Sequence, residues 1–276
     1  MAPRFFACFG IRASSTSAVE SRGGGGGGGC TADMAVEEQR RGGTVLVELF
    51  SSQGCATSDE AELLISRLGR GDFNEMGLPP VVVLAHHVDY WDYKGWKDPF
   101  GSSLSTVRQK AFVEALNLDT MFTPQVVVQG TAHCVGNDED ALLGLIKGAV
   151  RYPAPSFQAN FQRQKDTLQV SLSGALRTKI DSQGANVMVA LYENGLVTDC
   201  PRGENKGRVL SNDFVVRQIE KLCTVKDISA KKSVSGTVDF PVWEGFNGSK
   251  CSLAVFVQST SHQVFGSQNI ELPNDM

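Results

Sequence analysis

The chain has 276 residues, and 41% of them are hydrophobic, which is enough to build a packed core in one large domain or two ordinary ones. A formal net charge of -4 at pH 7 gives no basis for binding nucleic acid or an anionic membrane surface, so we expect neither partner. The apolar runs all fall short of the roughly 20 residues needed to cross a bilayer, so we expect no membrane span.

Residues 1–42 differ from the rest of the chain because they contain an unbroken glycine run at 23–29. Ordering a glycine run costs much backbone entropy and gains no side-chain contacts, so we predict a flexible tail. The tail carries Arg and Ser and no acidic residue before Glu20, a composition that fits two interpretations. It is either the uncleaved tail of a cytoplasmic protein, which we favour, or a plastid transit peptide that is removed.

Residues 43–152 have the pattern of one compact α/β unit. Short apolar runs rich in β-branched residues predict buried strands, and amphipathic stretches that follow Ser, Thr or Asp predict helices. The predicted order is β-α-β-α-β-β-α: strands at 44–50 and 81–87, helices after residue 57 and at 102–118, strands in "TPQVVVQG" and "TAHCVG", and a helix in "DEDALLGLIKGAVRY".

Residues 155–276 alternate between apolar and polar side chains, which is typical of antiparallel strands. In "NVMVALYE", for example, the alternation places Val187, Val189 and Leu191 on one face. We therefore predict a β-sandwich-like, mostly antiparallel second domain. The run "NDFVVRQIEKL" predicts one helix inside it.

The stretch "SSQGCATSDEAE" places Cys55 between the first predicted strand and the first predicted helix. Thioredoxin-like proteins carry their attacking thiol at this position. A thiolate there is stabilised by unpaired backbone N–H groups and by the helix dipole, whereas the acidic residues Asp59, Glu60 and Glu62 oppose it by like charge. The thiol is therefore either reactive or a small buried side chain.

Ser58 stands three residues after Cys55, where a two-thiol site has its second cysteine. None of the seven cysteines forms a Cys-x-x-Cys pair, which argues against a dithiol and against a zinc site. A serine hydroxyl does not attack a disulfide near neutral pH, so a mixed disulfide on Cys55 must be resolved by glutathione or another thiol. Cys134 is a weak alternative, because nothing in the sequence brings it near Cys55.

Thr123 and Pro124 directly precede an apolar strand. In thioredoxin-like folds a cis-proline at this place faces the active cysteine, and its backbone pairs with the bound thiol substrate. An ordinary trans-proline at the start of a strand is the alternative. We expect both residues to lie beside Cys55.

The segment "AHHVDYWDYKGWKDPF" is unusually rich in aromatic residues. His86 and His87 are neighbours on a strand and point to opposite faces, so we expect no shared metal ion there. The rings either form a rim that recognises a substrate or seal the sheet by packing. The candidate substrate-binding residues are His87, Asp89, Tyr90, Trp91 and Trp96.

Five runs, taken together, resemble an uncharacterised thioredoxin-like family, domain of unknown function 1223: "VELFSSQGC", "HHVDYWDYKGWKDPF", "RQKAF", "TPQVVVQG" and "GENKGRVL". The chain is similar to a plant-type member with Cys-x-x-Ser in place of Cys-x-x-Cys. The resemblance implies a thioredoxin-like fold with Cys55 and Pro124 at its site. Bacterial members typically read Ser-Gln-Gly-Cys-x-x-Cys-Pro-Pro and carry secretion signals, so the departure at Ser58 removes any implied dithiol mechanism.

Two functions stay open at this point. The first is a thiol-disulfide or glutathione-linked monothiol oxidoreductase, with Cys55 as nucleophile, Pro124 orienting the substrate, glutathione as co-substrate and no tightly bound cofactor. Its partner would be glutathione or a protein with a thiol or disulfide. The second is a redox-inactive thioredoxin scaffold that binds a ligand or protein through the aromatic segment and the β-rich part. Iron–sulfur or copper handling through Cys55 and a borrowed thiol is a weaker third idea, and the oligomeric state is left open.

Overall fold

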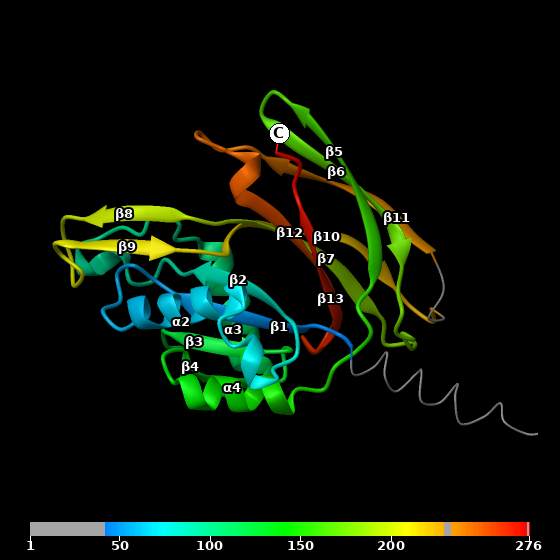
Figure 1. The fold of residues 1–276 in the computed structure, drawn as a ribbon, viewed down its shortest axis with the longest axis horizontal. Coiled ribbons are helices and arrows are strands. Elements are labelled where there is room, and N and C mark those ends of the chain that lie inside the picture. Colours follow the sequence, from blue (N-terminus) through cyan, green and yellow to red (C-terminus); the bar gives the residue numbers. More distant parts are fainter. Residues whose placement is uncertain (1–41, 229–232, 275) are drawn as a thin grey trace, which may run out of the picture.

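The computed structural model describes residues 42–228, 233–274 and 276, and it has a mixed α/β fold (Figure 1). Eight strands form one mixed sheet in the order β13-β12-β7-β10-β2-β1-β3-β4. Three further strands form a second sheet in the order β11-β6-β5, and β8 and β9 form a separate hairpin. The predicted tail over 1–42 lies, apart from residue 42, outside the described residues.

The elements between Val45 and Gly148 follow the predicted order β-α-β-α-β-β-α, and their strands form one half of the large sheet. β1 and β2 are parallel, β3 is antiparallel to β1, and β4 is antiparallel to β3. The elements are β1 (Val45–Ser51), α2 (Ser58–Arg70), β2 (Val81–His87), α3 (Ser103–Ala115), β3 (Gln125–Val128), β4 (Ala132–Val135) and α4 (Glu139–Gly148). In the described part of the chain, no helix is long and apolar enough to span a membrane.

The strands after residue 155 extend this same sheet as well as forming the second one. β10 lies parallel to β2, and β7, β12 and β13 follow it in antiparallel pairs. Because one sheet crosses the expected boundary near residues 152–155, the division into domains 43–152 and 155–276 stays a prediction. The strands are β5 (Ser156–Gln164), β6 (Thr167–Ala175), β7 (Ala185–Glu193), β8 (Leu196–Cys200), β9 (Arg208–Asn212), β10 (Val215–Val225), β11 (Ser233–Pro241), β12 (Cys251–Ser259) and β13 (Val264–Glu271).

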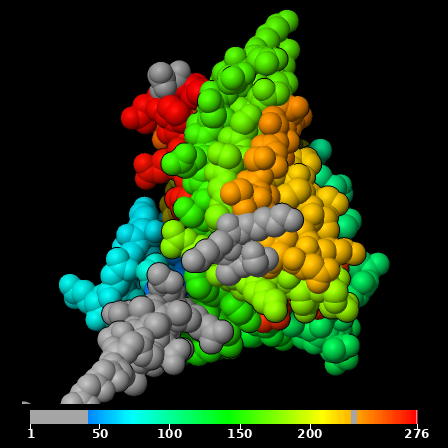
Figure 2. Space-filling view, turned by 90° about the vertical axis from the view of Figure 1, so that its right-hand side faces the viewer, coloured from blue at the N-terminus to red at the C-terminus, as the bar shows by residue number. Residues whose placement is uncertain are grey.

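Apolar side chains fill both faces of the large sheet. Every residue of β1 is buried, because α2 and α4 pack on one face of the sheet and α3 packs on the other. The three-stranded sheet covers β7 and β12, and the alternation predicted for these strands is confirmed, since Val187, Val189 and Leu191 all lie in the shared core. Figure 2 shows β5, β6 (green) and β11 (orange) side by side on the outer face of this layer.

The helix predicted in "NDFVVRQIEKL" is wrong, because these residues end β9 and form most of β10. β10 has two register irregularities against β7, between Val216 and Gln218 and between Lys221 and Cys223. Such bulges interrupt the two-residue alternation of a strand, so the apolar positions acquire a spacing that resembles a helix. Pairing with β7 and β2 then decides the conformation against the local pattern.

Candidate functional site

Cys55 lies in the loop between β1 and α2, three positions before the first residue of the helix. Its amide donates to the Ser52 carbonyl at 3.0 Å, and its own carbonyl accepts from the Ser58 amide at 3.3 Å. The Ser52 hydroxyl accepts from the Gly54 amide at 3.0 Å. These bonds make the loop a tight turn that leads the chain from the sheet edge into α2.

The Cys55 thiol is surrounded by hydrogen-bonding groups. Its Sγ lies 3.4 Å from the Thr57 hydroxyl and 3.7 Å from the Thr123 carbonyl oxygen. Burial alone would raise the pKa of this thiol, but hydrogen bonds with Ser58, Thr123 and Thr57 outweigh it and hold the pKa below its ordinary value. The arrangement therefore favours the thiolate.

Cys55 differs in this respect from the other cysteines of the described part of the chain. Burial raises the pKa of all four, to about 11 for Cys134 and to about 12 for Cys251. All five of these cysteines are free thiols, including Cys200 and Cys251. The hydrogen bonds around Cys55 thus single out one thiol.

Thr123 and Pro124 lie beside Cys55, as expected, and the peptide bond between them is cis. The Trp91 indole N–H donates to the Thr123 hydroxyl at 2.6 Å. The Pro124 carbonyl accepts from the Gly136 amide at 2.8 Å, which ties this loop to the end of β4.

The aromatic segment lies against the Cys55 loop. A Cβ added at Gly54 would be 3.1 Å from the Trp91 Cβ, so Trp91 packs directly on the turn. The Trp96 indole N–H donates to the Gln53 side chain at 3.1 Å. Tyr93 stacks against Trp91 and is 78% exposed, so the segment presents an aromatic surface next to the thiol.

Two predicted residues of this segment have other partners. Asp89 accepts from the Thr106 hydroxyl at 2.6 Å and thus contacts α3. The Tyr90 hydroxyl donates to the Gln109 side chain at 3.2 Å, and burial raises the pKa of Tyr90 to about 12. Tyr90 is therefore a neutral phenol between α3 and the Thr123 loop.

His87 is buried between two carboxylates beneath the Cys55 loop. Its Nδ1 lies 2.7 Å from Asp98 and its Nε2 lies 3.3 Å from Glu62. Burial alone would lower the pKa of His87, but the charges of Asp98 and Glu62 outweigh it and raise the pKa to about 10. Asp98 also accepts from the Gln53 amide at 2.8 Å, and Glu62 accepts from the Ser51 hydroxyl. The cation therefore links Glu62 of α2 with Asp98 of the aromatic segment, and these carboxylates hold Ser51 and Gln53.

His86 points to the opposite face of the sheet, as the alternation predicts, and belongs to a second buried group. Its Nε2 lies 3.0 Å from Glu48, which also accepts from Arg108 at 2.6 Å. Burial opposes ionisation of Glu48, but Arg108 and His86 lower its pKa to about 2, whereas burial lowers the pKa of His86. This group is therefore a Glu48–Arg108 ion pair with a neutral imidazole.

A loop from the C-terminal part of the chain completes the site. β9 packs beside α2 (Figure 1), and the loop between β8 and β9 reaches the Cys55 turn. The Asn205 side-chain amide, which is 1% exposed, donates to the Gln53 carbonyl at 2.9 Å and to the Cys55 carbonyl at 3.2 Å. One buried side chain thus holds both carbonyls of the turn.

The same hairpin supplies two ion pairs at the rim. Arg208 pairs with Asp59 in the first turn of α2, and its guanidinium also donates to the Asn205 side-chain oxygen at 3.0 Å. Glu204 pairs with Lys94 at 2.7 Å, and the Lys94 ammonium lies 4.1 Å from the centre of the Trp91 ring. Through these pairs the hairpin contacts both α2 and the aromatic segment.

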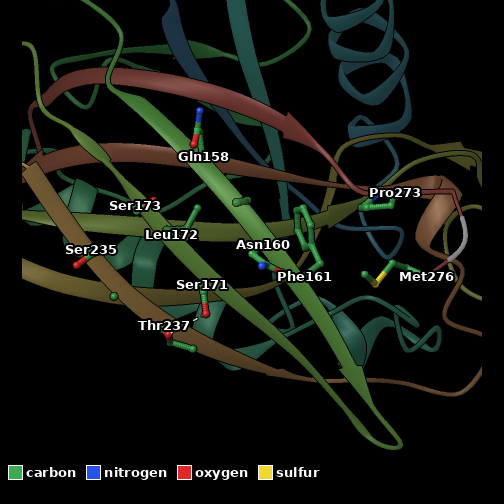
Figure 3. Close-up of a pocket in the computed structure, with 12 residues that line it drawn as sticks. Gln158, Asn160, Phe161, Ser171, Leu172, Ser173, Ser235, Thr237, Pro273 and Met276 are labelled. Atoms are coloured by element: carbon green, nitrogen blue, oxygen red, sulfur yellow. Dashed lines mark hydrogen bonds between the residues drawn. The ribbon is translucent and has the colours of Figure 1, made fainter.

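A cavity of about 10 Å³ lies below the turn, lined in part by Ser58, Glu62 and Asn205. A much larger hollow of about 800 Å³ lies along β5, β6 and β11 and ends at Pro273 and Met276 (Figure 3). None of the residues around Cys55 lines the larger hollow.

Within residues 42–228 and 233–274, no three His, Cys, Asp or Glu side chains form a metal-binding group. Both ring nitrogens of His87 already lie beside carboxylates, Nδ1 beside Asp98 and Nε2 beside Glu62.

The sequence model of the family described as "Protein of unknown function (DUF1223)" matches residues 46–258. The chain belongs to this family. The five sequence runs that resemble it meet at the Cys55 site or directly below it, since they supply Cys55, His87, Gln109, Thr123 and Asn205. The match also covers the hairpin, so the family region includes the C-terminal contacts to the turn.

Two solved structures are similar to this DUF1223 chain. Protein AGR_C_4864 from Agrobacterium tumefaciens is 23% identical with a TM-score of 0.58, and the alignment covers 84% of this chain and 95% of that one. HBP35 of Porphyromonas gingivalis is 14% identical with a TM-score of 0.58, over 83% of this chain and 75% of that one. Both likenesses concern the fold alone. No curated protein matches the chain.

The structure brings most of the predicted residues of the DUF1223 chain together. Ser58, Thr123, Trp91 and Trp96 surround the turn, and His87 lies below it, whereas Asp89 contacts Thr106 of α3. Sequence reasoning missed Glu62, Asp98, Asn205 and Arg208 as parts of the site. The run "GENKGR", which is rich in glycine and charged residues, indicates a turn, but nothing in the sequence indicates that this turn contacts the Cys55 loop.

Proposed function

We propose that this protein is a glutathione-linked monothiol oxidoreductase with Cys55 as its nucleophile. The observation that supports this most directly is the placement of the Cys55 thiol at the start of α2, 3.7 Å from the Thr123 carbonyl, with its pKa lowered by hydrogen bonds. We further propose that residues 43–152 are a thioredoxin-like unit, because their element order and the facing Thr123–Pro124 loop match that arrangement.

The proposed reaction is the reduction of a mixed disulfide between glutathione and a protein thiol. The Cys55 thiolate attacks the glutathione sulfur, the substrate disulfide breaks, and the protein leaves as a thiolate that takes up a proton. Reduced glutathione then attacks the Cys55–glutathione disulfide, which forms oxidised glutathione and restores the Cys55 thiolate. Each turn reduces one mixed disulfide and oxidises one glutathione thiol.

Ser58 fits this one-thiol route. Ser58 lowers the pKa of the Cys55 thiol, and its hydroxyl cannot displace a bound thiol. Pro124 and Thr123 are the residues that we propose to orient the substrate, and Trp91 holds the Thr123 hydroxyl in place.

The experiment is a deglutathionylation assay on a glutathionylated peptide with reduced glutathione, followed by mass spectrometry. The wild-type chain should release the peptide thiol at a rate proportional to its concentration. Cys55→Ser should reduce this rate to the uncatalysed one, whereas Cys134→Ser should retain it, because Cys134 packs in the core with a raised pKa. A wild-type rate equal to that of Cys55→Ser would reject the proposal.

A redox-inactive binding protein is the second candidate, and one observation favours it. Cys55 is only 7% exposed, whereas Tyr93, which stacks on Trp91, is 78% exposed. If recognition through the aromatic segment is the function, Tyr93→Ala should abolish retention of a binding partner, and Cys55→Ser should leave retention unchanged.

A further inference from the structure

The carboxylates near Cys55 are matched by cations from other elements. Asp59 pairs with Arg208 of the β8–β9 hairpin, Glu204 of that hairpin pairs with Lys94, and Glu62 lies beside the His87 imidazole. Glu60 has the neutral Asn137 amide as its partner. Asp59 is four positions from Cys55 in the first turn of α2, where its charge opposes a thiolate.

We propose that the β8–β9 hairpin keeps Cys55 reactive: Arg208 pairs with Asp59 in the first turn of α2, and Asn205 holds the turn that carries the thiol. The inference rests on the proposed function, since it takes Cys55 as the reacting group. It assigns a positioning role to two residues that lie about 150 positions from the thiol.

The contacts of the two residues form one continuous chain. Arg208 contacts Asp59 with one guanidinium nitrogen and the Asn205 oxygen with another. This fixes the orientation of the Asn205 amide, so that its nitrogen faces the Gln53 and Cys55 carbonyls. Removing Arg208 therefore leaves Asp59 without its cation and releases the amide that holds the turn.

The charge effect can be separated from a structural one by its sign. Arg208→Gln exposes the thiol to an uncompensated Asp59, which disfavours the thiolate and raises the pKa of Cys55. Asp59→Asn leaves Arg208 uncompensated, which favours the thiolate and lowers the pKa. The double variant removes both charges and should return the pKa close to that of the wild type. Loss of structure alone would not give opposite shifts in the two single variants.

The test measures the rate of Cys55 alkylation by iodoacetamide against pH, read by peptide mass spectrometry. Below the pKa, where the rate follows the thiolate fraction, Arg208→Gln should react about two- to fourfold more slowly and Asp59→Asn faster by a similar factor. Arg202→Gln, an exposed change in the same loop, is the matched control and should react like the wild type.

Equal pKa values for the wild type and both single variants, or shifts in the same direction, would overturn the inference. Alkylation reports Cys55 ionisation without any glutathione turnover. A chain that shows the opposite shifts but no deglutathionylation would therefore reject the proposed function alone, and an active chain without the shifts would reject this inference alone.

Discussion

The Asn205 side-chain amide donates to the Cys55 carbonyl at 3.2 Å, although 150 residues separate the two in the chain. The same amide binds the Gln53 carbonyl at 2.9 Å. The turn at the end of β1 is therefore held by a residue from the C-terminal part of the family region. The candidate site therefore includes residues that lie outside 43–152.

Replacing Asn205 by Ala should lower the free energy of unfolding by about 1–3 kcal/mol, because two carbonyls lose a buried donor. Urea unfolding followed by circular dichroism measures this change. Asn137→Ala removes an exposed amide that contacts Glu60 and should stay within about 0.5 kcal/mol of the wild type. Equal losses in the two variants would contradict the role given to Asn205.

The buried His87 should make the protein less stable in alkaline solution. Because the folded pKa of His87 is raised to about 10, above its unfolded value, its contribution is full below about pH 6.5 and is lost as the pH rises through about 10. Urea unfolding between pH 6 and 10.5 should show this decline.

His87→Gln is the matched variant for the pH experiment. It should destabilise the protein by about 3–5 kcal/mol near pH 6, since Asp98 and Glu62 lose their buried cation. Its stability should also change less than that of the wild type between pH 6.5 and 10. An identical alkaline decline in both proteins would show that His87 is not the responsible group.

Gly54 and Gly144 provide a matched pair of glycine substitutions. A Cβ at Gly54 would lie 3.1 Å from the Trp91 Cβ and carbonyl oxygen, so Gly54→Ala should destabilise the fold by about 1–3 kcal/mol. Gly144 is inside α4, and apart from the backbone of its own helix and its chain neighbours nothing lies within 4 Å of its Cβ position, so Gly144→Ala should stabilise by about 0.5–1 kcal/mol. Thermal unfolding compares the two, and a harmless Gly54→Ala would argue against the packing of Trp91 on the turn.

Ser58→Cys should convert the one-thiol site into a two-thiol site. In the wild type, a glutathione disulfide on Cys55 should persist until reduced glutathione is added. In the variant, the new thiol can attack that disulfide and release glutathione without a second molecule. Intact-mass spectrometry of the isolated mixed disulfide measures the difference. Persistence of the adduct in the Ser58→Cys variant would mean that position 58 cannot reach the Cys55 sulfur.

The elements of residues 43–152 are predictable from the sequence because local signals agree with the fold. β1 is a short apolar run buried on both faces, and α2 begins at Ser58 after a tight turn and ends before Gly71, which has a φ of 89°. Local signals fail at β10, where two bulges give the apolar residues a helix-like spacing and pairing with β7 decides the conformation.

The candidate site is predictable only where its residues adjoin the predicted elements. Cys55 and Thr123 stand at strand ends, so the element order is enough to bring them together. Asn205 and Arg208 reach the turn through a hairpin that belongs to neither of the other two sheets, and no periodicity in the sequence indicates that contact. The pairing of His87 with Asp98 likewise depends on how the aromatic segment folds back.

Cys55 should be ionised more readily than an ordinary thiol, and the dependence of its alkylation rate on pH measures this property. Peptide mass spectrometry can follow each cysteine separately, with Cys55→Ser as the control for peptide assignment. We expect an apparent pKa for Cys55 below that of an ordinary thiol, about 8.5, with Cys134 and Cys251 titrating well above it. A Cys55 pKa at or above about 8.5, or a thiol that reacts only when the chain unfolds, would show that the site does not activate Cys55.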